Sequence, residues 1–147
     1  MMPGMVLFEN GLGGRVAVYP FDFSVGMNKG FMNWRRRHQL QRVVRWLGRD
    51  RVDLFVDGGA WMMPLRRDYP NYTFVAVLNF ETDPWEAVTL TFDWAGPADG
   101  IRFELIDADG SFKPIQPLAL KSSGQNVAAE FALRVGPLDF AVWRITP

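Results

Sequence analysis

The sequence predicts a mainly β fold, an antiparallel β-sandwich with an N-terminal β-hairpin and one α-helix. Residues 72–80 form a run dense in β-branched and aromatic residues between turn formers, which favours a sheet strand. Near Arg51 the hydrophobic pattern changes from a helical period to a period of two, which continues towards the C-terminus. Turn signals then recur about every ten residues, a spacing typical of a sandwich or barrel.

The N-terminal part predicts a hairpin followed by a helix. Two short apolar runs, 5–9 and 15–19, flank Asn-Gly and Gly-Gly pairs that favour a tight turn. The glycine spacing of a dinucleotide-binding loop is absent, which favours the turn over a phosphate site. The helix is expected over 34–48, with Gly48 as its C-terminal cap. Its apolar stripe consists of Leu40, Val43, Val44 and Leu47.

The remaining strands follow from period-two alternation and turn residues. We expect 72–80 to be a central strand, buried on both faces for part of its length, and 87–93 to fold back on it antiparallel. Pro114 confines the extended stretch 112–120 to an edge or a loop. Further strands are expected over 52–56, 60–66, 101–106, 127–135 and 139–145. The predicted core contains Val75, Val77, Leu90, Phe92, Phe103, Leu105, Phe131, Leu133, Phe140 and Val142.

Composition limits the classes of function. The chain has 147 residues, no cysteine and a net charge of zero, so disulfides and thiolate metal sites are excluded. No apolar run approaches the roughly 20 residues of a membrane span, and residues 1–10 lack the features of a signal peptide, which favours a cytoplasmic location. Residues 1–51 hold nine basic and three acidic residues, a net charge of +6. The arginines of the predicted helix are explained best as a solvated face, with a docking surface as the alternative. Nucleic-acid binding is disfavoured, because aromatic residues do not interleave with the arginines.

The pattern of acidic and histidine residues predicts no catalytic site, metal or cofactor. His38 is the single histidine and has no cysteine or nearby acid to complete a metal site. Asp107, Asp109 and Gly110 resemble the start of a calcium loop, but the later ligands are missing and a tight β-turn explains them better. No pair of carboxylates is placed as a glycosidase requires.

Two of the six tryptophans are candidates for sugar binding. Trp85 and Trp94 fall at strand edges or in loops, where an exposed ring could stack on a sugar ring. The alternative is that each ring folds over the end of the sandwich. Trp34, Trp46 and Trp143 lie in regular elements and are expected in the core, and Trp61 fits either role.

Several segments resemble the C-terminal region of bacterial β-galactosidase-like glycoside hydrolases. The likeness is carried by 10–19, by Val-Val-Arg-Trp-Leu at 43–47, and by 74–80 with the acidic turn and the Val-Thr-Leu-Thr that follow. In that family a catalytic barrel is followed by a trimerisation-type domain and a small β-sandwich. The resemblance implies that 1–51 correspond to the end of the trimerisation-type domain and 52–147 to the small β-sandwich. The barrel and its catalytic acids have no counterpart here.

The resemblance therefore implies a non-catalytic accessory or assembly domain of a carbohydrate-active enzyme, with a carbohydrate-binding module as the alternative. The segment 1–51 is too small to bury its own apolar faces and is expected to pack on the sandwich. The apolar surface of 1–51 that the sandwich leaves uncovered is expected to contact a catalytic barrel or a second copy of the chain. The residues expected at that interface are Phe21, Phe23, Met27, Phe31 and Met32.

Overall fold

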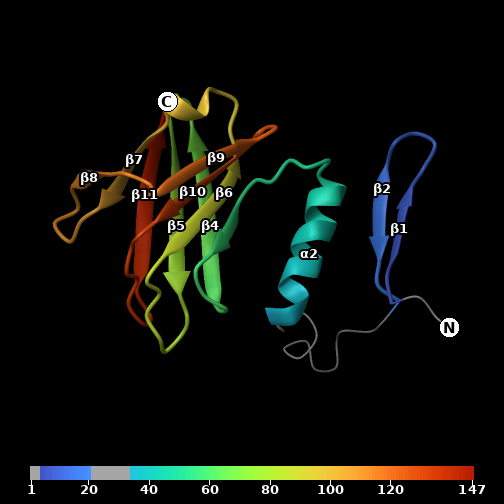
Figure 1. The fold of residues 1–147 in the computed structure, drawn as a ribbon, viewed down its shortest axis with the longest axis horizontal. Coiled ribbons are helices and arrows are strands. Elements are labelled where there is room, and N and C mark those ends of the chain that lie inside the picture. The colour runs from blue at the N-terminus through green and yellow to red at the C-terminus, as the bar shows by residue number, and fades with distance from the viewer. Residues whose placement is uncertain (1–3, 21–33) are drawn as a thin grey trace. The chain divides into compact units, whose positions relative to one another are not determined.

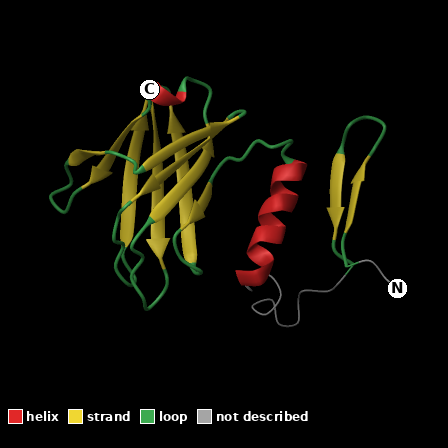
Figure 2. Ribbon diagram, viewed as in Figure 1, coloured by secondary structure: helices red, strands yellow, loops and turns green. Residues whose placement is uncertain are grey.

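The computed structural model describes residues 4–20 and 34–147, which divide into two units, Met1–Asp50 and Arg51–Pro147. The chain is mainly β, with antiparallel strands throughout (Figure 2). No helix in the described ranges is long and apolar enough to span a membrane. The second unit begins at Arg51, where the hydrophobic period of the sequence changes. Packing of the first unit on the second stays a prediction.

The first unit contains the predicted hairpin, formed by β1 (Val6–Glu9) and β2 (Arg15–Val18). The Oδ1 atom of Asn10 accepts hydrogen bonds from the backbone N–H groups of Leu12 (3.0 Å) and Gly14 (2.7 Å). Gly13 has a φ of +81°, a left-handed conformation that glycine adopts without steric cost. The Asn-Gly and Gly-Gly pairs therefore form a turn, as predicted.

The single described α-helix is α2 (Trp34–Leu47), close to the predicted 34–48. Gly48 is not the left-handed residue that ends it, because Arg49 (φ 54°) and Asp50 (φ 65°) take that conformation instead. The backbone N–H of Asp50 donates to the carbonyl of Arg45 at 2.8 Å and satisfies one of the last helical carbonyls. The prediction of a Gly48 cap is therefore wrong, although the helix does end beside it.

The apolar surfaces of the first unit are only partly covered. Val43 is buried, but Val44 and Leu47 of the same helical stripe are exposed. One face of the hairpin consists of apolar side chains that alternation places together, and all of them are exposed: Val6, Phe8, Val16 and Val18. A hairpin and a helix are too few elements to bury both faces of a two-stranded sheet, as expected from the sequence.

The second unit is a β-sandwich of two antiparallel sheets (Figure 1). The four-stranded sheet has the order β3-β6-β10-β9, and the five-stranded sheet has the order β4-β5-β11-β7-β8. Pro114 lies on the edge strand β8, as predicted. The strands are β3 (Phe55–Asp57), β4 (Met62–Tyr69), β5 (Tyr72–Asn79), β6 (Val88–Asp93), β7 (Arg102–Ile106), β8 (Phe112–Ile115), β9 (Ala119–Ser123), β10 (Asn126–Phe131) and β11 (Phe140–Thr146); a 3₁₀ turn, η1 (Ala98–Gly100), precedes β7.

The two strands at the middle of the sequence do not pair with each other. β5 pairs with β4 and β11, whereas β6 pairs with β3 and β10, so the link between them crosses from one sheet to the other. The expected hairpin of 72–80 with 87–93 is therefore wrong. β5 is central, but only one of its faces is fully buried. Crossing between sheets lets the apolar faces of β5 and β6 meet in one core.

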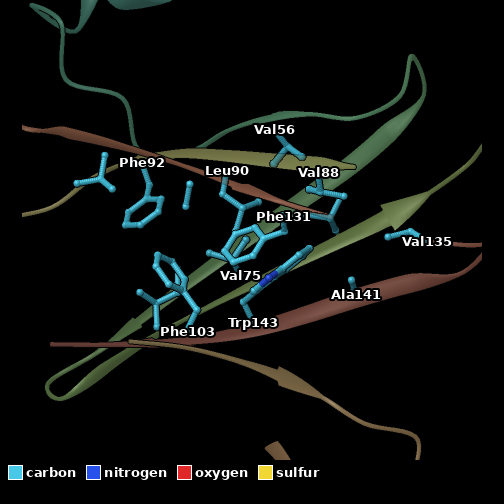
Figure 3. Packing of buried hydrophobic residues seen from close by; sticks show 14 of the residues in the cluster. Val56, Val75, Val88, Leu90, Phe92, Phe103, Phe131, Val135, Ala141 and Trp143 are labelled. Carbon is cyan, nitrogen blue, oxygen red and sulfur yellow. The ribbon is translucent and has the colours of Figure 1, made fainter. Parts of the chain in front are cut away.

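Side chains from the inner faces of both sheets fill the core (Figure 3). Of the predicted core, Leu105 and Leu133 are partly buried, whereas Phe140 is exposed and Val142 only half-buried. Alternation along β11 instead points Ala141, Trp143 and Ile145 inward. The predictions for Phe140 and Val142 are thus wrong, because the alternate set of residues on β11 faces the core. The remaining predicted residues are buried: Val75, Val77, Leu90, Phe92, Phe103 and Phe131.

Candidate functional site

Trp85 is a core residue and not a surface platform. Its side chain is 2% exposed, and its indole N–H donates to Oε2 of Glu81 at 2.6 Å. Its backbone forms an isolated antiparallel bridge with Val135, with N–O distances of 3.0 Å in both directions. The prediction that Trp85 presents an exposed ring to a sugar is therefore wrong, and the alternative of a ring folded into the end of the sandwich is correct.

Gly59 makes room for the Trp85 ring. A Cβ atom at Gly59 would lie 1.9 Å from Nε1 of Trp85 and 2.6 Å from Oε2 of Glu81. The other carboxylate oxygen of Glu81, Oε1, accepts hydrogen bonds from the backbone N–H groups of Ala60 (2.7 Å) and Trp61 (3.2 Å). Glu81 therefore fixes the approach to β4 and the Trp85 ring together, and only glycine fits between them.

Asn79 connects the β5–β6 link, which contains Trp85, with the chain before β11. The residue is 1% exposed, and its Nδ2 donates to the carbonyls of Asp83 (3.0 Å), Val135 (3.3 Å) and Gly136 (3.0 Å). Its Oδ1 accepts from the backbone N–H of Glu81 at 2.8 Å. One buried amide thus satisfies polar groups of the β5–β6 link and of the chain before β11.

Trp94, the other predicted sugar-binding residue, lies at the wall of a pocket of about 410 Å³, here called the Trp94 pocket. The ring packs edge-on against Phe92, with centroids 6.1 Å apart, and is half-buried. The lining of this pocket includes Arg66, Asp68, Thr73 and Asp93. Whether Trp94 binds sugar stays a prediction.

The charged groups of the Trp94 pocket are occupied with one another. Burial opposes the charge of Arg66, but hydrogen bonds to Asp93 and Asp68 outweigh it and raise the Arg66 pKa. Burial also opposes ionisation of Asp68, yet hydrogen bonds from Thr73 (2.8 Å) and Arg66 (2.9 Å) lower its pKa. Asp68 is therefore stabilised as an anion, which makes it a poor proton donor at neutral pH.

A larger pocket, of about 570 Å³, lies on the outer face of the five-stranded sheet and is here called the Arg102 pocket. Arg144 lies next to Glu104 across β11 and β7, and its Nε donates to Oε2 of Glu104 at 2.6 Å. The Arg144 guanidinium also lies over the Phe112 ring, 4.4 Å from the centroid. The hydrogen bond between Arg144 and Glu104 lowers the pKa of Glu104 and raises the pKa of Arg144. Sequence analysis did not single out these residues.

The same outer face has an apolar half, defined by strand register. Reading across β4, β5, β11 and β7, the outward side chains in this half are all apolar. Trp61, Met63, Leu65, Phe80 and Phe140 are each 41–59% exposed. The half is completed by Ala76, Leu78, Ile106 and Val142, which are partly exposed. A solvated face of an antiparallel sheet normally alternates to polar residues, so this one is unusual.

The other candidates from the sequence are the Asp107–Gly110 segment, His38 and the predicted interface residues. The Asp107–Gly110 segment is a tight turn, with Gly110 at φ +82° and its N–H 2.9 Å from the Asp107 carbonyl. His38 is exposed on α2. Within residues 4–20 and 34–147, no group of three or more histidine, cysteine or acidic residues could hold a metal ion. The predicted interface residues Phe21, Phe23, Met27, Phe31 and Met32 lie outside the described residues.

Comparison with protein-family models, curated proteins and solved structures found no match to this chain.

Proposed function

We propose that this chain is a non-catalytic accessory domain of a carbohydrate-active enzyme, and that the sandwich docks through the apolar half of its five-stranded sheet. The carbohydrate part of the proposal comes from the resemblance to bacterial β-galactosidase-like glycoside hydrolases. The docking part is carried by one observation, the exposed apolar side chains that all the neighbouring strands contribute to one surface.

The apolar half is suited to packing against protein. It contains no charged residue, so covering it removes apolar surface from water without burying an unpaired charge. The charged residues of the same face, Arg67, Arg102, Glu104 and Arg144, lie in the other half. A covered apolar centre with a polar margin is the usual arrangement of a protein interface. In a longer enzyme the partner would be another domain; in the isolated chain it would be a second copy.

The chemistry of the described carboxylates supports a non-catalytic role. A glycosidase needs one carboxylic acid whose pKa is raised, so that it can protonate the leaving oxygen, opposite a second carboxylate. In the two pockets Asp68 and Glu104 have lowered pKa values, because arginine and hydroxyl groups donate hydrogen bonds to them. Glu81 is committed to Trp85 and to backbone N–H groups.

We therefore expect the purified chain not to hydrolyse glycosides. The assay is release of nitrophenol from aryl β-galactosides and aryl β-glucosides, with a catalytic β-galactosidase as the positive control. Sustained turnover that disappears when one carboxylate is replaced, for example in Glu104→Gln or Asp68→Asn, would show that the chain is itself an enzyme.

A further inference from the structure

The Arg102 pocket combines groups that suit one kind of ligand, and its charge is the first of them. Arg102 and Arg144 face the same pocket as Glu104, which leaves one uncompensated positive charge. Arg144 is held by Glu104 and Phe112, whereas Arg102 is exposed and has no ion pair with any described residue. A planar guanidinium with free N–H donors matches the geometry of a carboxylate.

The lining also contains an aromatic ring and two side-chain amides. Tyr72 lines the pocket, and Tyr69 stacks on its ring with centroids 4.8 Å apart. The side chains of Asn71 and Gln116 can each donate and accept hydrogen bonds, as the hydroxyl groups of a sugar require. Aromatic surface beside planar polar groups suits a ring with an apolar face and polar edges. The volume of about 570 Å³ lies within the range of small-molecule sites.

From these features we propose that the Arg102 pocket binds a saccharide residue that carries a carboxylate, such as a hexuronate. Arg102 pairs with the carboxylate, Tyr72 packs against the ring, and Asn71 and Gln116 bind its hydroxyl groups. A phosphate group fits less well, because a dianion would face only one uncompensated cation and the carboxylate of Glu104. The proposal rests on the carbohydrate part of the proposed function, since sugar is taken as the ring that bears the carboxylate.

Calorimetric titration of the full chain tests this site with four probes: D-galacturonate, trigalacturonate, D-galactose and acetate. We expect both uronates to bind, and D-galactose and acetate to bind at least about tenfold more weakly, because each lacks one of the two recognised features. Tighter binding of trigalacturonate than of the monosaccharide would place the ligand within a polymer, and equal binding would indicate a single sugar residue.

Three variants localise the binding. Arg102→Gln removes the free cation and should weaken uronate binding about tenfold or more. Lys121→Gln, which removes an exposed cation from the other sheet, should leave it unchanged. Trp94→Ala alters the other pocket and reports whether sugar binds there instead. Uronate binding that is absent from the wild type, or unchanged in Arg102→Gln, overturns the proposal. Galactose binding that is lost only in Trp94→Ala, with no binding of either uronate, overturns the Arg102 site but keeps a carbohydrate-binding function. Glycoside turnover would overturn the accessory role itself.

Discussion

Gly59→Ala is expected to lower the free energy of unfolding by about 3–5 kcal/mol. The added Cβ would lie 1.9 Å from Nε1 of Trp85 and 2.6 Å from Oε2 of Glu81, closer than atoms can approach. The Trp85 ring is 2% exposed and cannot move outward without opening the core, so its hydrogen bond to Glu81 would be lost as well. Urea unfolding followed by circular dichroism measures the change.

Gly100→Ala is the matched control for this substitution. A Cβ at Gly100 would meet only Cγ of Pro97, at 4.0 Å, so its effect should stay within about 0.5 kcal/mol. If Gly59→Ala were as stable as Gly100→Ala, the packing of Trp85 against Gly59 described above would be incorrect.

Asn79→Leu is expected to cost about 2–4 kcal/mol, because it removes four hydrogen bonds that the buried Asn79 amide makes to backbone groups, most of them partly buried. The carbonyl of Asp83 loses its Asn79 donor, the carbonyl of Gly136 keeps only the N–H of Asp139 at 3.3 Å, and the N–H of Glu81 loses its Asn79 acceptor. A loss of this size is a large fraction of the roughly 5–15 kcal/mol that stabilises a typical domain. Thermal and urea unfolding should both show it.

Two further variants test this role: Asn79→Asp keeps the shape of the side chain but changes its hydrogen bonds, and Gln125→Leu is a control. Asn79→Asp keeps the acceptor for the Glu81 N–H but places a carboxylate against carbonyl oxygens. Its folded-state pKa should be raised, so the variant should lose stability relative to the wild type as pH rises from 4 to 7. Gln125→Leu, at an exposed turn position, should change stability by less than about 0.5 kcal/mol. An Asn79→Leu protein as stable as Gln125→Leu would contradict the role assigned to Asn79.

Local sequence patterns predicted the elements of this fold better than their pairing. The alternation of Val88, Leu90 and Phe92 with polar residues identified a half-buried strand correctly. The short link to the preceding strand suggested a hairpin. That prediction failed because the length of a link carries no information about which sheet the next strand joins. The crossing of the chain between sheets depends on Asn79 and Trp85, whose partners Val135 and Gly136 lie fifty or more residues away in the sequence.

The site was harder to predict than the fold, for a related reason. Phe140 and Val142 were placed in the core because both phases of β11 are apolar, although Arg144 shares their phase and marks it as outward. The same signal, apolar residues on both faces of β4, β5 and β11, could have revealed the apolar half of the outer sheet. The Arg102 pocket forms from β5, β7 and β11 together, and only the strand order brings them side by side.

The proposed docking role depends on the apolar half of the five-stranded sheet being a contact surface. Sedimentation velocity of the purified chain at micromolar concentrations, with binding of an apolar fluorescent dye, tests this directly. The matched variants are Leu65→Lys with Phe140→Lys, on the apolar half, and Thr89→Lys with Thr91→Lys, on the outer face of the other sheet. Both pairs add the same charge, so only their position differs.

We predict that the wild type and the Thr89→Lys/Thr91→Lys protein self-associate, because an exposed apolar surface without charge favours a second copy of itself. The Leu65→Lys/Phe140→Lys protein should remain folded and sediment as a monomer. A wild-type chain that stays monomeric and binds no apolar dye, or association that persists in the Leu65→Lys/Phe140→Lys protein, would contradict the proposal that the sandwich docks through this face.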